Sequence, residues 1–538
     1  MNNTLVLTGM MGSGKTSIGK EASTILGLKF YDTDLEIEKT LNMKIKDIFK
    51  LKGQNYFRQV EEKICIDLIN GERKIVALGG GAFLNSAIRE IVLKKSFSIW
   101  INVNLKTIVK RIKLSKNIRP MLDYDNLENS IKTILDERTP IYKMASITIE
   151  ANNVSKKKLS VKYKKIMGNQ KKINIHTDHN NYPIFIGKNI LKNFNKYYLS
   201  LCPKSKKILF VTNSKIPSSY LSNIKSKITK KSKIYIINIP AGEKNKNLLE
   251  VNKILDFLTV NNFDRNDTVV ALGGGVVGDM AGFAASIFKR GIDFVQIPST
   301  LLAQVDSSVG GKTGVNNNHG KNLIGTFYHP KFVIIDINIL NSLPKREMVS
   351  GFAEVLKYSL IMNKKFFLWL CKEGVHIVNR TKSSSILKAI HVSCKSKSIV
   401  VNKDEKERGL RAILNFGHTL GHALESHLRY SSQLNHGEAV IIGMMAAAKV
   451  SHQKGFLNER ELEKINNLYE QLKLNCSIKK YIRLAQLKNF SQIMKKDKKN
   501  NSDTINLILL KKIGKAFIYK TTLEQTLIPF IKNELKNG

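Results

Sequence analysis

The sequence predicts an α/β protein made of a phosphate-loop domain with a parallel sheet, a Rossmann-like α/β domain and an all-α domain. Three observations lead to this prediction. Short β-branched runs alternate with helical apolar spacing up to about residue 340, a pattern typical of parallel sheets. Two of these runs end in glycine loops, at 9–16 and 273–278. Beyond Leu343-Pro344, helical apolar spacing continues almost to the end of the chain.

The first predicted domain covers residues 1–168. Its strands are expected in TLVLTG, KIVALGG, FSIWINV and SITIE, and a helix with Ser155 as its N-cap is expected over 155–166. The polar segment GNQKK at 168–172 interrupts the pattern. We therefore expect a linker at 169–172.

The second predicted domain covers residues 173–340, with strands in KILFVT and KIYIINI. The third covers 341–538 and is expected to be helical, because FAEVLKYSLIM, HTLGHALESHL and GEAVIIGMMAAAKV carry helical spacing. The pentapeptide ALGGG occurs at 77–81 and again at 271–275, but the flanking residues do not match. Two independent strand-to-turn sites are expected, not a duplication.

Composition bounds the class of protein. The chain has 538 residues and a formal net charge of +45, but its lysines are spread along the whole length, which favours a basic solvated surface over a dedicated nucleic-acid site.

Five scattered cysteines without a CxxC pair indicate reduced thiols and a cytoplasmic location. MNNTLVLTG has no basic region before an apolar one, so no signal peptide is expected, and no apolar run is long enough to span a membrane.

The first glycine loop, GMMGSGKT at 9–16, has the form GxxxxGK[ST] between a predicted strand and a predicted helix. This context is the one that phosphate binding requires. Backbone amides of Gly12, Ser13 and Gly14 would surround the phosphates of ATP. Lys15 would reach the β and γ oxygens, and Thr16 would be a ligand of Mg²⁺.

Further motifs follow this loop in order: DTD with Asp32 and Asp34, FR with Arg58, GGG at 79–81, RPML with Arg119 and RTPIY with Arg138. Together with the loop, this set resembles shikimate kinase. Gluconate-type and nucleoside kinases share the loop but not the later motifs.

The resemblance implies a role for each of these residues. Shikimate would be held by Asp34, Arg58, Gly80 and Arg138, since an arginine fork suits its carboxylate. Asp34 would also orient the attacking hydroxyl, and Asp32 would lie near Mg²⁺. Arg119 would stabilise the transferring phosphoryl group from a mobile lid, and Arg111 would lie on the adenine side. Gln54 stands where the family usually has glutamate, which implies that Arg58 loses an ion-pair partner.

The second glycine loop has the spacing Gly273-x-Gly275-x-x-Gly278, with Gly278 opening a helix. By itself this is a weak dinucleotide signal, and Asp293 lies at about the usual distance for a ribose contact, although the resemblance given below assigns it no role. The stretch that follows is more specific, because Asp306, Lys312, Lys321 and Asn322 gather in a segment rich in glycine and serine. The whole of 271–327 resembles 3-dehydroquinate synthase, an NAD-dependent enzyme.

Histidines and a glutamate with helical spacing indicate a metal site. Glu354 and Lys357 lie three residues apart, His418 and His422 lie four apart, and His436 follows in NHGEAV. One carboxylate with two imidazoles is a zinc set that leaves a position open for substrate. Thr419 stands where a HExxH metalloprotease would have its glutamate, which disfavours a protease.

The resemblance then distributes the remaining roles. The zinc (or cobalt) ligands would be Glu354, His418 and His436, with His422 left for substrate. NAD would be contacted by Asn213, Glu243, Lys246, Gly275, Asp279, Ser299, Thr300, Lys321 and Asn322. The sugar acid phosphate would be contacted by Asp306, Lys312, Lys321, Lys357, Lys397, Arg411 and Lys498. Catalytic roles are implied for Lys312, Lys357, Arg411, Asn415 and His422.

The activities implied are phosphorylation of shikimate by ATP with Mg²⁺, and conversion of a heptulosonate 7-phosphate to 3-dehydroquinate with release of phosphate. The family also implies a homodimer through the second half. The alternatives for that half are a related sugar-phosphate cyclase or a zinc polyol dehydrogenase. A basic nucleic-acid scaffold with inactive enzyme folds would require broken catalytic positions, and none is broken in the sequence.

Overall fold

The computed structural model describes residues 4–70, 72, 74–115, 122–152, 170–177, 180–228, 232–407, 409–497 and 504–537. The chain divides into two compact units. The first unit consists of Met1–Asn174 with Asn195–Pro203, and the second of Ile175–Phe194 with Lys204–Gly538.

The first unit is built on a five-stranded parallel sheet with the strand order β2-β3-β1-β4-β5. The strands are β1 (Thr4–Thr8), β2 (Phe30–Asp32), β3 (Ile75–Ala77), β4 (Ser96–Asn102) and β5 (Ile147–Glu150). Leu5, Val6 and Leu7 are fully buried, as expected for a strand covered on both faces. The strands predicted from TLVLTG, KIVALGG, FSIWINV and SITIE are therefore confirmed.

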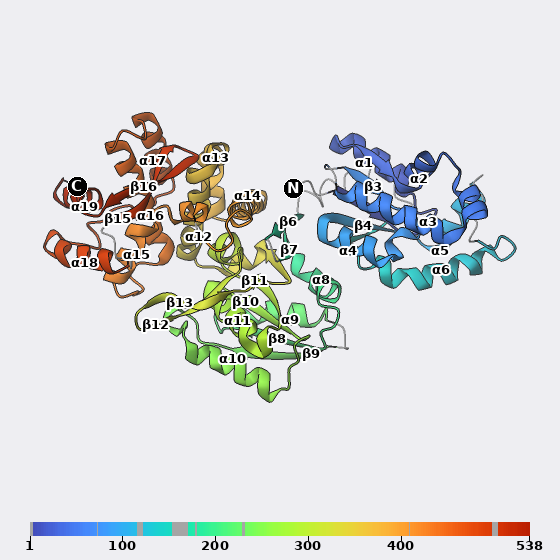
Figure 1. Cartoon of the computed structure of the whole chain (residues 1–538), viewed down its shortest axis with the longest axis horizontal. Helices are drawn as coiled ribbons and strands as arrows, with labels where there is room; N and C mark the ends of the chain where they lie inside the picture. Colours follow the sequence, from blue (N-terminus) through green and yellow to red (C-terminus); the bar gives the residue numbers. More distant parts are fainter. Residues whose placement is uncertain are drawn as a thin grey trace. The chain divides into compact units, whose positions relative to one another are not determined.

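Six helices of the described residues connect these strands (Figure 1). They are α1 (Lys15–Leu26), α2 (Thr33–Leu41), α3 (Ile45–Asn70), α4 (Ser86–Lys95), α5 (Leu105–Lys113) and α6 (Leu127–Tyr142). The helix predicted over 155–166 lies outside the described residues. Because β1, β2 and β3 are neighbours and run in parallel, the segments after them meet at one edge of the sheet.

From β6 onward the chain forms a seven-stranded sheet with the order β6-β7-β14-β11-β10-β8-β9. Its strands are β6 (Gln170–His176), β7 (Asn181–Gly187), β8 (Lys207–Thr212), β9 (Lys233–Asn238), β10 (Thr268–Gly273), β11 (Asp293–Pro298) and β14 (Phe332–Asp336). From β7 to β9 the pairing is parallel throughout. The helices in this stretch of the chain are α8 (Phe194–Leu201), α9 (Ser218–Lys225), α10 (Leu248–Val260) and α11 (Gly275–Ile287), and Asn195–Pro203, which includes most of α8, is grouped with the first unit.

Two predictions in this region need correction. The linker predicted at 169–172 is wrong for Gln170–Lys172, which form the start of β6. The strand was missed because its first residues are polar, and the alternation of apolar and polar residues becomes apparent only at Ile173 and Ile175. The helix expected to open at Gly278 begins earlier, at Gly275, directly after the turn.

A short antiparallel hairpin lies between β11 and β14 in the chain. It consists of β12 (Lys312–Asn317) and β13 (Gly320–Phe327). The hairpin carries the predicted residues Lys312, Lys321 and Asn322, so this part of the segment rich in glycine and serine is a two-stranded ribbon.

The remainder of the chain is helical, as predicted, and is coloured from yellow to red in Figure 1. The helices are α12 (Lys345–Met362), α13 (Lys364–Val378), α14 (Ser383–Val401), α15 (His418–His427), α16 (His436–Gln453), α17 (Glu459–Gln471), α18 (Leu487–Asp497) and α19 (Leu527–Asn537). The structure adds a hairpin that the all-α prediction did not contain, formed by β15 (Thr504–Lys512) and β16 (Lys515–Thr522). Within the described residues, no helix combines the length and apolar character needed to cross a bilayer.

Candidate active sites

The phosphate loop of the first unit joins β1 to α1 and depends on glycine conformations. Gly9, Gly12 and Gly14 have φ values of 141°, 74° and 91°, which side chains other than glycine rarely adopt. The ammonium group of Lys15 donates to the carbonyls of Gly9 at 2.8 Å and Met10 at 2.9 Å. It is therefore held over the loop, at the N-terminus of a helix that favours anions.

The predicted magnesium-side residues meet across the sheet edge. The hydroxyl of Thr16 donates to Oδ2 of Asp32 at 2.5 Å. Asp32 ends β2 and caps α2, accepting from the amide of Asp34 at 3.1 Å. One carboxylate therefore fixes both the loop threonine and the start of the helix that carries Asp34. A hydroxyl and a carboxylate are ligands that Mg²⁺ uses beside phosphate oxygens.

The glycines after β3 lie against the side chains predicted to hold shikimate. A Cβ added to Gly79 would lie 2.5 Å from Oδ1 of Asp34, and one added to Gly81 would lie 2.6 Å from the guanidinium of Arg58. Arg138 is buried and donates to the carbonyl of Gly80 at 3.2 Å. The structure thus brings Asp34, Arg58, Gly80 and Arg138 together at this edge.

Arg58 has an ion-pair partner that sequence reasoning missed. Its guanidinium lies 2.5 Å from the carboxylate of Glu61, one helical turn away on α3, and the Glu61 side chain is 2% exposed. Burial raises the pKa of Glu61, although Arg58 and Arg138 act against this effect. The loss of the partner that the family usually has at position 54 therefore does not leave Arg58 unpaired. The i,i+3 spacing of Arg58 and Glu61 was the available signal.

Two further predicted residues concern the nucleotide. Arg111 on α5 donates to the carbonyls of Gly12 at 3.1 Å and Ser13 at 3.2 Å, so it lies against the phosphate loop. Arg119, the predicted lid residue, lies outside the described residues.

The second unit contains a cavity of about 860 Å³ at the carboxyl ends of its central strands. Asn213 follows β8, Gly275 follows β10, and Ser299 and Thr300 follow β11, and all of them line the cavity. Ligands bind at this edge in open parallel sheets. The other predicted residues in the lining are Glu243, Lys246, Asp279, Asp306, Lys321, Asn322, His422 and His436.

A buried cation organises the nucleotide side of this cavity. The ammonium of Lys246 lies 2.5 Å from Oδ2 of Asp279 on α11 and 2.5 Å from Oδ1 of Asn322 on the β12–β13 hairpin. Burial alone would lower the pKa of Lys246, but the charges of Asp279 and Glu243 outweigh it and raise the pKa. Lys246 therefore stays charged and connects three segments that were predicted to contact NAD.

The predicted zinc ligands form one cluster. Glu354 on α12, His418 on α15 and His436 on α16 each offer a donor atom within 4.8 Å of the others. Glu354 is 1% exposed, pairs with Lys357, and has one oxygen 3.5 Å from Nε2 of His418. Burial lowers the pKa of His418 well below its ordinary value, and the charge of Lys357 adds to this. A buried carboxylate with a neutral imidazole suits Zn²⁺ or Co²⁺.

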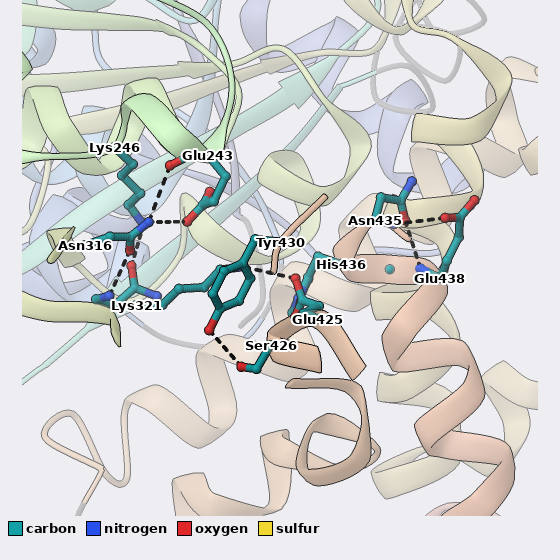
Figure 2. A network of polar contacts seen from close by, with 12 residues as sticks. Glu243, Lys246, Asn316, Lys321, Glu425, Ser426, Tyr430, Asn435, His436 and Glu438 are labelled. Atoms are coloured by element: carbon teal, nitrogen blue, oxygen red, sulfur yellow. Dashed lines mark hydrogen bonds and ion pairs between the residues drawn. The ribbon is translucent and has the colours of Figure 1, made fainter. Parts of the chain in front are cut away.

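Glu425 is a further site residue that sequence reasoning missed. It lies on α15, and its carboxylate contacts Lys321 at 3.0 Å and Nδ1 of His436 at 3.0 Å (Figure 2). Burial would raise its pKa, but His436 and Lys321 lower it to about 2. The same contact raises the pKa of His436, against the effect of burial. Its position three residues after His422 was the only hint in the sequence.

The remaining lysines divide into two groups. Lys397 contacts Oδ1 of Asp306 at 2.8 Å, and Tyr358 donates to the same oxygen at 2.7 Å. Burial would raise the pKa of Asp306, but Lys397 and Lys357 hold it well below its ordinary value. These charges compensate one another inside the protein.

Lys312 and Asn415 converge on a different acid. Lys312 pairs with Glu407, and Asn415 lies 3.4 Å from the other carboxylate oxygen of Glu407. Arg411 is buried and donates to the carbonyl of Glu405. None of these three predicted residues is among those lining the described cavity. Lys498, and its competitor Lys499, lie outside the described residues.

Fold and sites define a chain with two separate catalytic units, a phosphate-loop phosphotransferase and an α/β-helical enzyme with a nucleotide cavity beside a metal-ligand triad. Comparisons with known protein families divide the chain into the same two parts. A family model described as shikimate kinase matches residues 11–167, and the N-terminal and C-terminal models of 3-dehydroquinate synthase match 236–350 and 351–500. The chain belongs to the 3-dehydroquinate synthase family and carries an N-terminal domain of the shikimate kinase family.

Curated relatives match the second unit over almost their whole length. The 3-dehydroquinate synthase of Pelagibacter ubique is 49% identical over 365 residues, which are 68% of this chain and 98% of the relative. The enzyme of the same name from Shewanella denitrificans is 41% identical over 359 residues, 67% of this chain and 98% of the relative. Among solved structures, the chain is similar to 2-deoxy-scyllo-inosose synthase complexed with carbaglucose-6-phosphate, NAD⁺ and Co²⁺. The TM-score is 0.61 at 25% sequence identity, and the match covers 68% of this chain and 100% of that one.

Proposed function

We propose that the chain catalyses two reactions of aromatic biosynthesis. The first unit phosphorylates shikimate with ATP and Mg²⁺, giving shikimate 3-phosphate and ADP. The second converts 3-deoxy-D-arabino-heptulosonate 7-phosphate to 3-dehydroquinate and phosphate, with NAD⁺ and a divalent metal. The observation that supports the second activity best is that Glu354, His418 and His436 surround one point beside the cavity.

In the kinase unit, the chain's own groups position two anions. The phosphate loop and Lys15 hold the nucleotide, and Arg58 and Arg138 grip the acceptor's carboxylate in a planar fork. Asp34, at the start of α2, orients the acceptor hydroxyl toward the γ-phosphate. Bound Mg²⁺, beside Thr16 and Asp32, would offset the charge of the phosphates.

In the synthase unit, the cofactor and the metal ion bind on different sides of one cavity. Asn213, Lys246 and the glycine turn hold the nucleotide. Asp306, Lys321 and Lys397 surround the sugar acid. Glu354, His418 and His436 would hold the metal. When bound, NAD⁺ would accept and return one hydride and the metal would polarise the hydroxyl that is oxidised.

His422 lines the cavity close to His436, with ring centroids 5.9 Å apart. From this position an imidazole can move a proton on the substrate without being a metal ligand. Elimination of phosphate needs a proton removed beside the transient ketone, and aldol closure needs one delivered. We assign both proton transfers to His422.

One experiment tests both activities. The purified chain is supplied with shikimate and MgATP, and separately with the heptulosonate phosphate, NAD⁺ and Zn²⁺, while ADP and released phosphate are measured. We expect both products, and no steady rise of NADH absorbance, because the hydride taken up is returned. Accumulating NADH would instead indicate a polyol dehydrogenase. A cyclic product other than 3-dehydroquinate would indicate a related sugar-phosphate cyclase.

We also infer a cytoplasmic homodimer. All five cysteines are free thiols, and Cys65, Cys202 and Cys394 are buried, which suits a reducing compartment. Dimerisation through the synthase half is implied by the family resemblance. Light scattering of the intact chain and of its second half tests it, and a mass of one chain for both would contradict it.

A further inference from the structure

Glu425 has both carboxylate oxygens engaged at the centre of the synthase site. Oε1 accepts from the ammonium of Lys321 at 3.0 Å, and Oε2 lies 3.0 Å from Nδ1 of His436. The residue is 4% exposed. A carboxylate accepts, so Nδ1 of His436 carries the proton in this contact. The imidazole then presents its other nitrogen, Nε2, as the free donor atom.

The two partners come from different parts of the second unit. Lys321 lies on β13, in the hairpin next to the Rossmann-like sheet, and Glu425 and His436 lie on α15 and α16 of the helical part. The ammonium of Lys321 also lies 4.2 Å from the ring centre of Tyr430, whose hydroxyl contacts Ser426 at 2.8 Å (Figure 2). Lys321, Glu425 and His436 all line the cavity. Glu425 therefore joins the two walls of the site.

Within the described residues, two overlapping sets of side chains could each bind a metal ion. The first is Glu354, His418 and His436, and the second is His422, Glu425 and His436. In the second set, a metal ion on Glu425 would share its carboxylate with the ammonium of Lys321 and the Nδ1–H of His436, which reduces the negative charge that the carboxylate offers. In the first set, its contacts are preserved, because a metal at Nε2 of His436 leaves the Nδ1 contact intact. The geometry therefore favours one metal ion on the first set.

We propose that Glu425 is a positioning residue that orients His436 for the metal and holds Lys321 at the cofactor side of the same cavity. The inference rests on the proposed metal-dependent function. A carboxylate behind a metal-bound imidazole fixes the tautomer and the ring orientation and makes the nitrogen a better donor. Through Lys321, the same carboxylate links metal binding to the placement of the anionic ligands.

The test is the zinc affinity of Glu425→Gln, measured by competition with a chromogenic chelator on the intact chain without substrates. Loss of such an outer partner typically lowers metal affinity about 10- to 100-fold, and we expect a change in this range. Glu438→Gln is the matched control. Glu438 lies in the first turn of the same helix, two residues after His436, but contacts Asn435 and Arg346 instead. Its zinc affinity should stay within about twofold of wild type.

A second pair of measurements isolates the link to Lys321. We expect Glu425→Gln and Lys321→Met both to raise the KM for NAD⁺ or sugar phosphate, and only Glu425→Gln to weaken zinc. Glu425→Asp, which keeps the charge but shortens the reach, serves as the second variant if Glu425→Gln lowers the melting temperature of the metal-free chain. It should weaken zinc in the same direction.

Three outcomes would overturn the inference. If His418→Ala loses zinc while Glu425→Gln and Glu425→Asp bind it as wild type does, the positioning role fails and the proposed function stands. If wild type binds two ions and Glu425→Gln binds one, Glu425 is itself a ligand. If wild type binds no zinc, the metal-dependent function fails as well.

Discussion

The pentapeptide ALGGG occurs once in each unit, and the two copies are used in opposite ways. After β3, the first copy leaves room for side chains from elsewhere, since a Cβ on Gly79 or Gly81 would collide with Asp34 or Arg58. After β10, the second copy leaves room for its own turn, since a Cβ on Gly273 would lie 2.5 Å from Val277, one turn into α11. The same pentapeptide thus accommodates side chains of the proposed acceptor pocket in one unit and forms the proposed nucleotide turn in the other. The helices that pack against each triplet, α2 and α3 in the first unit and α11 in the second, account for the difference.

The two sites also differ in their cations. In the first unit, the acceptor pocket that we propose contains Arg58 and Arg138, and planar guanidinium groups match a carboxylate in two-point contact. The second unit uses lysines, each tied to a specific acid: Lys246 to Asp279, Lys321 to Glu425 and Lys397 to Asp306. These ammonium groups are positioned point charges, which suits a substrate whose shape changes during the reaction.

The strongest test of two separate sites is Lys15→Ala. The substitution removes the only charged side chain of the phosphate loop, and we expect shikimate phosphorylation to fall roughly 1,000-fold, as for loss of a preorganised charge at a phosphoryl group. Phosphate release from the heptulosonate substrate should be unchanged. Coupled assays of ADP and of inorganic phosphate on the same preparation measure both. Near wild-type kinase activity would place the nucleotide elsewhere.

The converse test is His418→Ala. Removing one of three protein ligands should eliminate tightly bound zinc and lower phosphate release by about 100-fold or more, while ADP formation from shikimate continues. Metal content by plasma emission spectrometry checks the first expectation. A mutant with the zinc stoichiometry of wild type would rule out His418 as a ligand.

Smaller effects should distinguish the two glycine triplets. Gly81→Ala places a methyl group against the flexible end of Arg58, so Arg58 can shift, and we expect about a tenfold higher KM for shikimate, equivalent to about 1.4 kcal/mol, with little loss of stability. Gly273→Ala places it against the Cβ and both methyl groups of Val277. We expect about 1–3 kcal/mol of destabilisation there. Urea unfolding and shikimate kinetics of both variants give the comparison, and equal patterns would contradict it.

Much of the fold and most site residues could be predicted, because strand-glycine-helix motifs specify both local geometry and position at a sheet edge. Glu61 and Glu425 were missed, because a spacing of three residues from Arg58 or from His422 is a weak signal on a helix, and the contacts of Glu425 with Lys321 and His436 are set only by packing. The β15–β16 hairpin did have a signal. Two β-branched and aromatic runs flank Ile513-Gly514, and Gly514 has a φ of 83°, as a two-residue hairpin requires. The surrounding helical pattern obscured it.

The smallest effect is expected from separating the two units, because the sites proposed for each unit are built from residues of that unit alone. We expect residues 1–168 and 169–538, expressed separately, each to keep kcat/KM within about tenfold of the intact chain, a change below about 1.4 kcal/mol. The cut precedes Gln170 because β6 belongs to the seven-stranded sheet. A matched piece starting at residue 173 lacks the first three residues of β6 and should melt at a lower temperature with similar kinetics. The two reactions are not consecutive, so the product of one unit is not the substrate of the other. No intermediate can therefore be channelled between the units. A loss greater than tenfold in either piece, with its fold intact by circular dichroism, would mean that each unit depends on the other for its activity.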